Sequence, residues 1–241
     1  MLKNKLNTSY TNVEGQVYPN VLEYHFQSGE DFAVGKVIAS SHDSDTDAYG
    51  YGQGFYIYED EENPDIGYRI YREYKNANDC DEQKNADYIQ KLQSIQNNVL
   101  LTTFPYGVVT LDKRIVGQII PIYHNCVSLR QYVKEHGWEC EDIYLECLNI
   151  LKELCANGAY YYDMNADNFL ITNDGIKLID FEDHQMEFDH AFSPKQERVI
   201  HNFRIMLMIL SRSQIKEKYA NFINANSFAE LEAILKSGKQ K

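Results

Sequence analysis

Three polar residues in one stretch of the chain carry side chains suited to metal-assisted chemistry. Asp163 and Asn168 lie five positions apart, and Asp180 follows them. The Asp163 carboxylate can accept a hydroxyl proton, whereas an amide oxygen and a second carboxylate are ligands that Mg²⁺ prefers. These are the groups that phosphoryl transfer uses. A structural explanation stays open, because Asp and Asn are common in turns, where their side chains cap backbone groups.

A β-hairpin is expected to bring Asp180 back beside this loop. Residues 169–171 are apolar and predict one strand, and residues 176–179 predict the returning strand. The tripeptide Asn-Asp-Gly at 173–175 is typical of a tight turn between two strands. The three polar side chains should therefore lie in one compact site.

The order of these elements resembles the protein-kinase-like superfamily, in which a loop with Asp and Asn precedes a strand pair and an Asp-Phe dipeptide. The resemblance implies that Asp163 is the catalytic base or orients the acceptor hydroxyl, and that Asn168 and Asp180 bind Mg²⁺ or Mn²⁺. It also implies that ATP is the cofactor.

The same resemblance implies an α+β, two-lobed protein-kinase-like fold. Residues 1–120 would form a small antiparallel β-sheet lobe that binds the nucleotide, and residues 121–241 a reduced helical lobe with the catalytic loop. The first thirty residues have no assigned role.

A glycine-rich segment and a strand arginine are the first candidate nucleotide contacts. Gly50, Gly52 and Gly54 precede a predicted strand, and glycine lets backbone N–H groups approach phosphate oxygens. A purely structural Gly-rich hairpin is an equal alternative. By the resemblance, Arg69 takes the place of the phosphate-binding lysine, with Arg72 as second choice. The alternative for Arg69 is a solvent-facing position on an edge strand.

A helix and a hinge supply the remaining candidate contacts. Glu82, in a helix expected at residues 79–95, is chosen to pair with Arg69, because Asn85, the residue that the superfamily's register would select, cannot form an ion pair. By the resemblance, Ile119 or Ile120 lies at the back of the nucleotide pocket. Pro121 lacks an N–H, so hydrogen bonding to adenine is assigned to Ile122 or Tyr123, and Gly67 to the small adenine-facing position.

Apolar periodicity predicts the other elements. Strands are expected at residues 21–26, 32–38, 55–58, 66–71, 99–101, 108–111 and 115–120, and helices at 128–133, 142–157, 197–212 and from Ser227 onward, where Ser-x-x-Glu is a capping-box pattern.

Several residues depart from the protein-kinase pattern. Tyr161 and Tyr162 stand in place of His and Arg, Asn165 in place of Lys, and Glu182 in place of the Gly of Asp-Phe-Gly. These features resemble aminoglycoside and choline kinases, on the small-molecule side of the superfamily. An acidic, His-containing segment at 183–190 could bind a cationic or hydroxyl substrate, although a solvated loop is the favoured interpretation.

The sequence leaves three activities open. The first is an ATP- and Mg²⁺-dependent phosphotransferase acting on a hydroxyl of a small molecule or a protein. The second is a pseudokinase that binds a nucleotide or a partner without turnover, which Arg69 in place of Lys favours. The third is transfer of AMP rather than phosphate, which the same fold performs in some relatives.

Composition argues against two kinds of partner. A net charge of −13 and a pI near 4.9 provide no basic surplus for nucleic acid. No apolar run follows the two early lysines, so no signal peptide is expected. No window approaches eighteen apolar residues, so membrane association is not expected. Five cysteines without a Cys-x2-Cys pair are typical of reduced thiols in a cytoplasmic protein.

Overall fold

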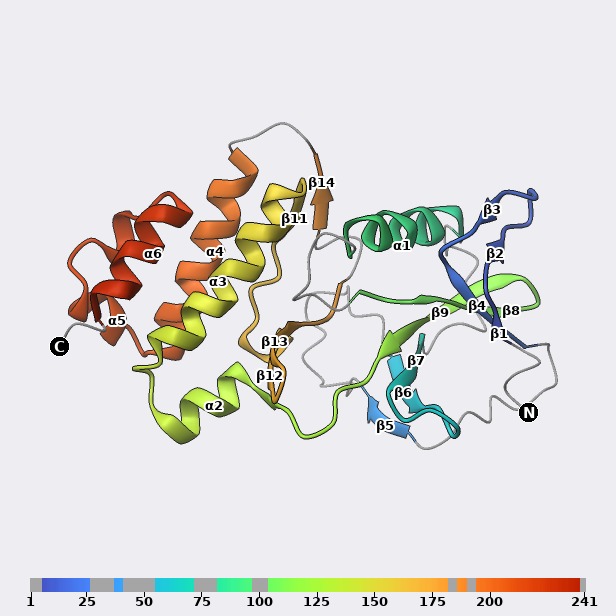
Figure 1. The fold of residues 1–241 in the computed structure, drawn as a ribbon, viewed down its shortest axis with the longest axis horizontal. Helices are drawn as coiled ribbons and strands as arrows, with labels where there is room; N and C mark the ends of the chain where they lie inside the picture. The colour runs from blue at the N-terminus through green and yellow to red at the C-terminus, as the bar shows by residue number, and fades with distance from the viewer. Residues whose placement is uncertain are drawn as a thin grey trace, which may run out of the picture. The chain divides into compact units, whose positions relative to one another are not determined.

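The computed structural model describes residues 6–26, 37–40, 55–71, 82–96, 104–181, 186–189 and 194–238. The chain divides into two compact units. The sheet unit comprises residues 1–94 and 104–124, and the helical unit comprises residues 95–103 and 125–241. Strands predominate in the first and helices in the second (Figure 1). The expected α+β class is confirmed.

Seven strands form the main sheet of the sheet unit, in the spatial order β1-β4-β8-β9-β7-β6-β5. Strands β5, β6 and β7 form an antiparallel meander, as their aromatic and β-branched residues predict. The bounds are β1 Leu6–Asn7, β4 Leu22–Phe26, β5 Val37–Ser40, β6 Phe55–Glu59, β7 Ile66–Tyr71, β8 Gly107–Leu111 and β9 Arg114–Pro121. Of the two other expected strands, 32–38 falls within the described residues only at its end, and 99–101 lies outside them.

One strand pair corrects the expectation of an antiparallel sheet. β4 runs parallel to β8, with Leu22 opposite Gly107, so the sheet is mixed. A parallel pair needs a long crossover, and residues 27–106 provide it, with helix α1 (Glu82–Gln96) among them. Hairpin signals identify only strands that are neighbours in sequence, which is why this pair was not predicted. The backbones approach closely here, because a methyl group on Gly107 would lie 2.0 Å from the Leu22 carbonyl oxygen.

The core on one face of this sheet is rich in aromatic residues. The Tyr24 and Tyr68 rings are 4.8 Å apart at their centroids, and large aromatic side chains contribute much of a core's buried apolar area. The buried residues of this cluster are Tyr24, Tyr68, Ile70, Val109, Val116 and Ile119.

Residues 6–26, which had no assigned role, belong to the sheet unit. Besides β1 and β4 they form a hairpin of β2 (Tyr10–Thr11) and β3 (Val17–Tyr18). The rings of Tyr10 and Tyr18 stack at 5.6 Å, and the Tyr18 hydroxyl donates a 3.0 Å hydrogen bond to Asp87 of α1. The hairpin thus contacts the helix that was expected to bear Glu82.

The helical unit contains two small sheets and five helices in its described part. Helix α3 lies at its centre, because most of the α3 residues with apolar side chains are buried. The helices are α2 Leu129–His136, α3 Glu141–Ala156, α4 Pro194–Leu210, α5 Gln214–Lys218 and α6 Phe228–Ser237. One sheet joins β10 (Val127–Ser128), β12 (Phe169–Thr172) and β13 (Gly175–Leu178), and the other joins β11 (Ala159–Tyr161) and β14 (Met186–Phe188).

Helix starts agree with the sequence signals to within a few residues. Ser128 caps α2 by accepting a hydrogen bond from the backbone N–H of Gln131. The predicted capping box is confirmed, since the Ser227 side chain accepts from the Glu230 N–H and the Glu230 carboxylate accepts from the Ser227 N–H. Sequence patterns did not identify α5, β10, β11 or β14, which are short elements that tertiary contacts stabilise.

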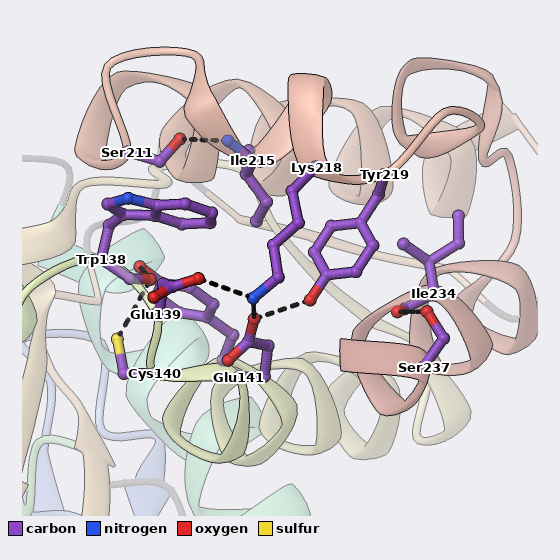
Figure 2. A network of polar contacts seen from close by, with 11 residues as sticks. Trp138, Glu139, Cys140, Glu141, Ser211, Ile215, Lys218, Tyr219, Ile234 and Ser237 are labelled. Carbon is purple, nitrogen blue, oxygen red and sulfur yellow. Dashed lines mark hydrogen bonds and ion pairs between the residues drawn. The ribbon is translucent and has the colours of Figure 1, made fainter. Parts of the chain in front are cut away.

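A charged network joins the start of α3 to the end of α5 (Figure 2). Lys218 Nζ lies 2.9 Å from Glu139 Oε1 and 2.7 Å from Glu141 Oε1. The Tyr219 hydroxyl donates a 2.6 Å hydrogen bond to Glu141, and Lys218 also lies 5.2 Å from the centroid of the Trp138 ring. The network ties segments that are far apart in the sequence.

Within the described ranges, no helix combines the length and the apolar character needed to span a membrane.

Candidate functional site

The hydroxyl of Tyr161 joins the parts of the candidate site. Tyr161 ends β11, and its side chain is fully buried. The hydroxyl oxygen accepts a 2.8 Å hydrogen bond from Asn168 Nδ2. It also lies 3.3 Å from the carbonyl oxygen of Ile179 and 3.4 Å from that of Asp180, so its proton is shared between two acceptors. One buried hydroxyl therefore links the loop to the end of the following hairpin.

Asn168 connects this hydroxyl to Asp163. Its Nδ2 donates a 2.8 Å hydrogen bond to Asp163 Oδ2, and the residue is buried. Because the amide nitrogen faces Asp163 and Tyr161, the amide oxygen points away from them. The side chain therefore presents an oxygen, the atom that a hard cation would bind.

The hairpin places Asp180 next to Asn168, as the sequence predicted. Strands β12 and β13 pair antiparallel around a two-residue turn. The N–H of Ile179 donates to the Asn168 carbonyl oxygen at 2.9 Å. Asp180 has a φ of 64°, in the left-handed region, which costs roughly 1–2 kcal/mol for a residue with a Cβ. Such strain persists where surrounding contacts enforce it, and it is frequent at functional sites.

Phe181 completes the packing around Tyr161. It is almost fully buried, and its ring meets the Tyr161 ring edge-on at 5.5 Å. The sequence interpretation treated Tyr161 only as a replacement for His and missed its connecting role. The available signal was a run of three tyrosines that leads directly into the loop.

Asn165 has a structural function at the position of the expected Lys. Its Oδ1 accepts a 3.1 Å hydrogen bond from the Asp167 N–H and caps the short 3₁₀ helix η2 (Ala166–Asn168). Arg130 Nη2 donates to the same oxygen at 3.1 Å, and Arg130 Nε donates to Asp167 at 2.7 Å. Ser128 donates to the other Asp167 oxygen at 2.9 Å. These bonds stabilise the loop without adding a cation directed at Asp163.

The donor set of Asp163, Asn168 and Asp180 fits Mg²⁺ in chemical type. It offers two carboxylates and one amide oxygen, all hard oxygen ligands. No group of three or more His, Cys, Asp or Glu side chains suited to a metal occurs in the described part of the chain. The candidate set contains only two residues of those types.

Arg69 is buried in the sheet unit, which excludes the solvent-facing alternative. β7 lies between β9 and β6, so it is not an edge strand. Only 5% of Arg69 is exposed, and its guanidinium carbon lies 4.1 Å from the centroid of the Phe55 ring. Burial and the contact with the ring hold the Arg69 guanidinium in place, so it has less freedom of movement than the ammonium of a lysine at this position.

Ile122, a candidate adenine contact, packs against Gly67 within the sheet unit. A Cβ built on Gly67 would come within 2.5 Å of Ile122 Cδ1, so this side chain already covers Gly67. The Ile122 N–H donates to the Asp65 carbonyl oxygen at 2.9 Å. In this structure the N–H that the sequence interpretation assigned to adenine is therefore engaged within the sheet unit. Ile120 lies opposite Gly67 in the β7–β9 register.

Several candidate residues lie outside the described residues. These are Gly50, Gly52, Gly54, Arg72, Glu182, Asp183, His184 and His190. Glu82 is the first residue of α1, and its side chain is also outside them. The structure thus brings Asp163, Asn168 and Asp180 together in the helical unit and places Arg69, Ile120 and Ile122 in the sheet unit.

Part of the acidic segment at 183–190 forms β14 rather than a loop, and two of its partly exposed acidic side chains pair with cations. Lys195 Nζ lies 3.0 Å from Glu187 and 2.8 Å from Asp189. Arg198 lies 3.8 Å from Glu187 and 4.1 Å from the centroid of the Tyr162 ring. Burial, followed by the charge of Glu187, raises the pKa of Tyr162, and Arg198 partly opposes this rise.

Comparison with known proteins gives no assignment: no family model matches the chain, and no curated protein matches it.

Proposed function

We propose that the protein is a Mg²⁺-dependent phosphotransferase with a protein-kinase-like fold that transfers phosphate from ATP to a hydroxyl acceptor. The observation that supports this most is the bonding around Tyr161, whose hydroxyl connects Asn168 and the backbone at Asp180 while Asn168 also bonds Asp163. Turn formation alone does not require Asp163, Asn168 and the backbone of Asp180 to be linked through one buried hydroxyl.

Each side chain of the site has a distinct role in this proposal. Bound Mg²⁺ would neutralise phosphate charge during transfer. Asn168, through its amide oxygen, and Asp180, through its carboxylate, would hold the metal. Asp163 would accept the proton of the acceptor hydroxyl and align that oxygen. The hydrogen bond from Asn168 holds one carboxylate oxygen of Asp163 and thereby fixes the direction in which the carboxylate points.

The proposal is tested by turnover with ATP labelled at the γ-phosphate, Mg²⁺ or Mn²⁺, and a panel of alcohols and proteins. Asp180→Ala should abolish transfer. Asp174→Ala is the matched control, because Asp174 lies at the exposed tip of the same hairpin. It should retain wild-type transfer. Turnover by the wild type that never exceeds that of Asp180→Ala refutes the proposal.

A second function, a pseudokinase that regulates a partner, is favoured by the sheet unit. Ile122 covers Gly67 and uses its own N–H, and Arg69 is buried against Phe55. These contacts disfavour a nucleotide bound in the expected way. Thermal stabilisation by ATP that requires metal but occurs without turnover supports this function, because a ligand stabilises the state that it binds.

Transfer of AMP is distinguished by the position of the label. Label from the α-phosphate would then appear in the acceptor, and label from the γ-phosphate would not. The proposed phosphotransferase gives the opposite distribution.

A further inference from the structure

One side of helix α4 contacts both β14 and the residue before Asp163. Lys195, Arg198 and Asn202 are spaced three and four residues apart, so they lie along one side of the helix. Lys195 pairs with both Glu187 and Asp189, the acidic residues of the β14 segment. The first turns of α4 therefore carry the counter-charges of that segment.

Two α4 side chains hold Tyr162. The Arg198 guanidinium lies 4.1 Å from the centroid of the Tyr162 ring and 3.8 Å from Glu187. Asn202 Nδ2 donates to the Tyr162 carbonyl oxygen at 2.9 Å, and the N–H of Met164 donates to that same oxygen at 2.9 Å. The Tyr162 hydroxyl is buried and has no hydrogen-bond partner in the described part of the chain. The ring is thus held by Arg198 rather than by a hydroxyl contact.

Strand β14 is attached to the same region through β11. Tyr161, the last residue of β11, lies opposite Met186 of β14. The N–H of Asp189 donates to the Gly158 carbonyl oxygen at 2.9 Å. The ion pair at Glu187 therefore lies on β14, and β11, the strand that pairs with β14, ends at Tyr161 in the candidate site.

We propose that Arg198 is a positioning residue that fixes the Tyr162–Asp163 backbone and β14 together. Protein kinases have an Arg at the position of Tyr162. In this chain the cation next to that position is Arg198, which belongs to α4. Its counter-charge, Glu187, is part of the chain, so this anchoring requires no added phosphate. The anchoring itself does not depend on the proposed function. Only the catalytic role of Asp163 rests on it.

Backbone hydrogen exchange tests the anchoring without any turnover. The full chain is treated with phosphatase, and intact mass verifies that it carries no phosphate. In Arg198→Gln the amides of Met164 and Asp189 should exchange about 2- to 5-fold faster, the range expected for one exposed cation–π contact. Arg198→Lys should leave Asp189 protected and expose Met164, because an ammonium can pair with Glu187 but stacks poorly on a ring.

Arg204→Gln is the matched control, because Arg204 lies on the same helix and bonds the Ile223 carbonyl oxygen instead. It should leave both amides at wild-type rates. Unchanged exchange in Arg198→Gln, or an equal change in Arg204→Gln, overturns the inference. So does an unphosphorylated wild type in which neither amide is protected.

Kinetics separate the inference from the proposed function. For an active enzyme, Arg198→Gln should lower kcat about 10-fold or more and change KM for ATP less than about 2-fold, because Asp163 would be displaced while nucleotide contacts remain. Equal losses in kcat and in ATP affinity argue against positioning. Faster exchange in Arg198→Gln with no turnover by the wild type rejects the phosphotransferase and supports the anchoring.

Discussion

Removing the Tyr161 hydroxyl tests the candidate site most directly. Tyr161→Phe keeps the ring, so the edge-on contact with Phe181 and the buried apolar area remain. The change removes the acceptor of one Asn168 N–H and the donor to the carbonyl oxygens of Ile179 and Asp180. A buried polar group left without its partner costs about 1–3 kcal/mol.

The expected result is a free energy of unfolding lowered by that amount, which urea titration measures. In a chain of this length 1 kcal/mol corresponds to about 2–4 °C in Tm, so Tm should fall by several degrees. The proposed phosphate transfer should fall about 10- to 100-fold, because the Asn168 amide would lose one of the two bonds that orient it beside Asp163.

Tyr160→Phe is the control for this experiment. Tyr160 is the preceding residue of the same strand and is equally buried, but its hydroxyl takes no part in the hydrogen bonds that join Asn168, Ile179 and Asp180. The free energy of unfolding of Tyr160→Phe should stay within about 0.5 kcal/mol of that of the wild type. If the two variants unfold at the same urea concentration, the hydroxyl of Tyr161 does not hold the site together, and the reasoning fails.

Three further predictions concern single contacts. Gly67→Ala should destabilise the protein by about 1 kcal/mol because its methyl meets Ile122 Cδ1, and adding Ile122→Ala should recover part of this loss in a double-mutant cycle. Burial raises the pKa of Glu141, but hydrogen bonds from Lys218 and Tyr219 lower it by more, so the pKa lies below the ordinary value of a Glu carboxyl. Its ionised form therefore stabilises the fold above about pH 4.3 and loses this effect as the pH falls, so Glu141→Gln should cost about 1–3 kcal/mol at pH 7 and less at pH 3.5 by denaturant titration. Ser227→Ala should lower the unfolding free energy by about 1 kcal/mol through loss of the α6 cap, and an unchanged urea midpoint would contradict the cap's contribution.

The elements that the sequence predicted correctly are those with strong local signals. The hairpin of β12 and β13 has a turn tripeptide and two apolar strands, and α6 has a capping box. Helix α3 has a continuous apolar stripe, and its predicted bounds differ from the observed ones by one residue at each end. In each case the residues that determine the element lie within it, so periodicity and caps suffice.

The elements that were missed depend on residues distant in the sequence. β4 pairs with β8 only after the long crossover, and β14 forms because β11 lies beside it. The engagement of Ile122 with Gly67 and Asp65 joins two segments of the sheet unit that are far apart in the sequence, and no local pattern specifies it. Such contacts arise from packing, which can override local preferences.

The sequence by itself determined the chemical groups of the candidate site, since Asp163, Asn168 and Asp180 were chosen from residue types and spacing, and it determined the hairpin between them. Only the tertiary structure decided how these groups are held. The direction of the Asn168 amide is set by the Tyr161 hydroxyl, and the left-handed backbone of Asp180 is enforced by its surroundings. A buried hydrogen bond depends on which groups folding brings within about 3 Å of each other, and spacing along the chain does not specify that.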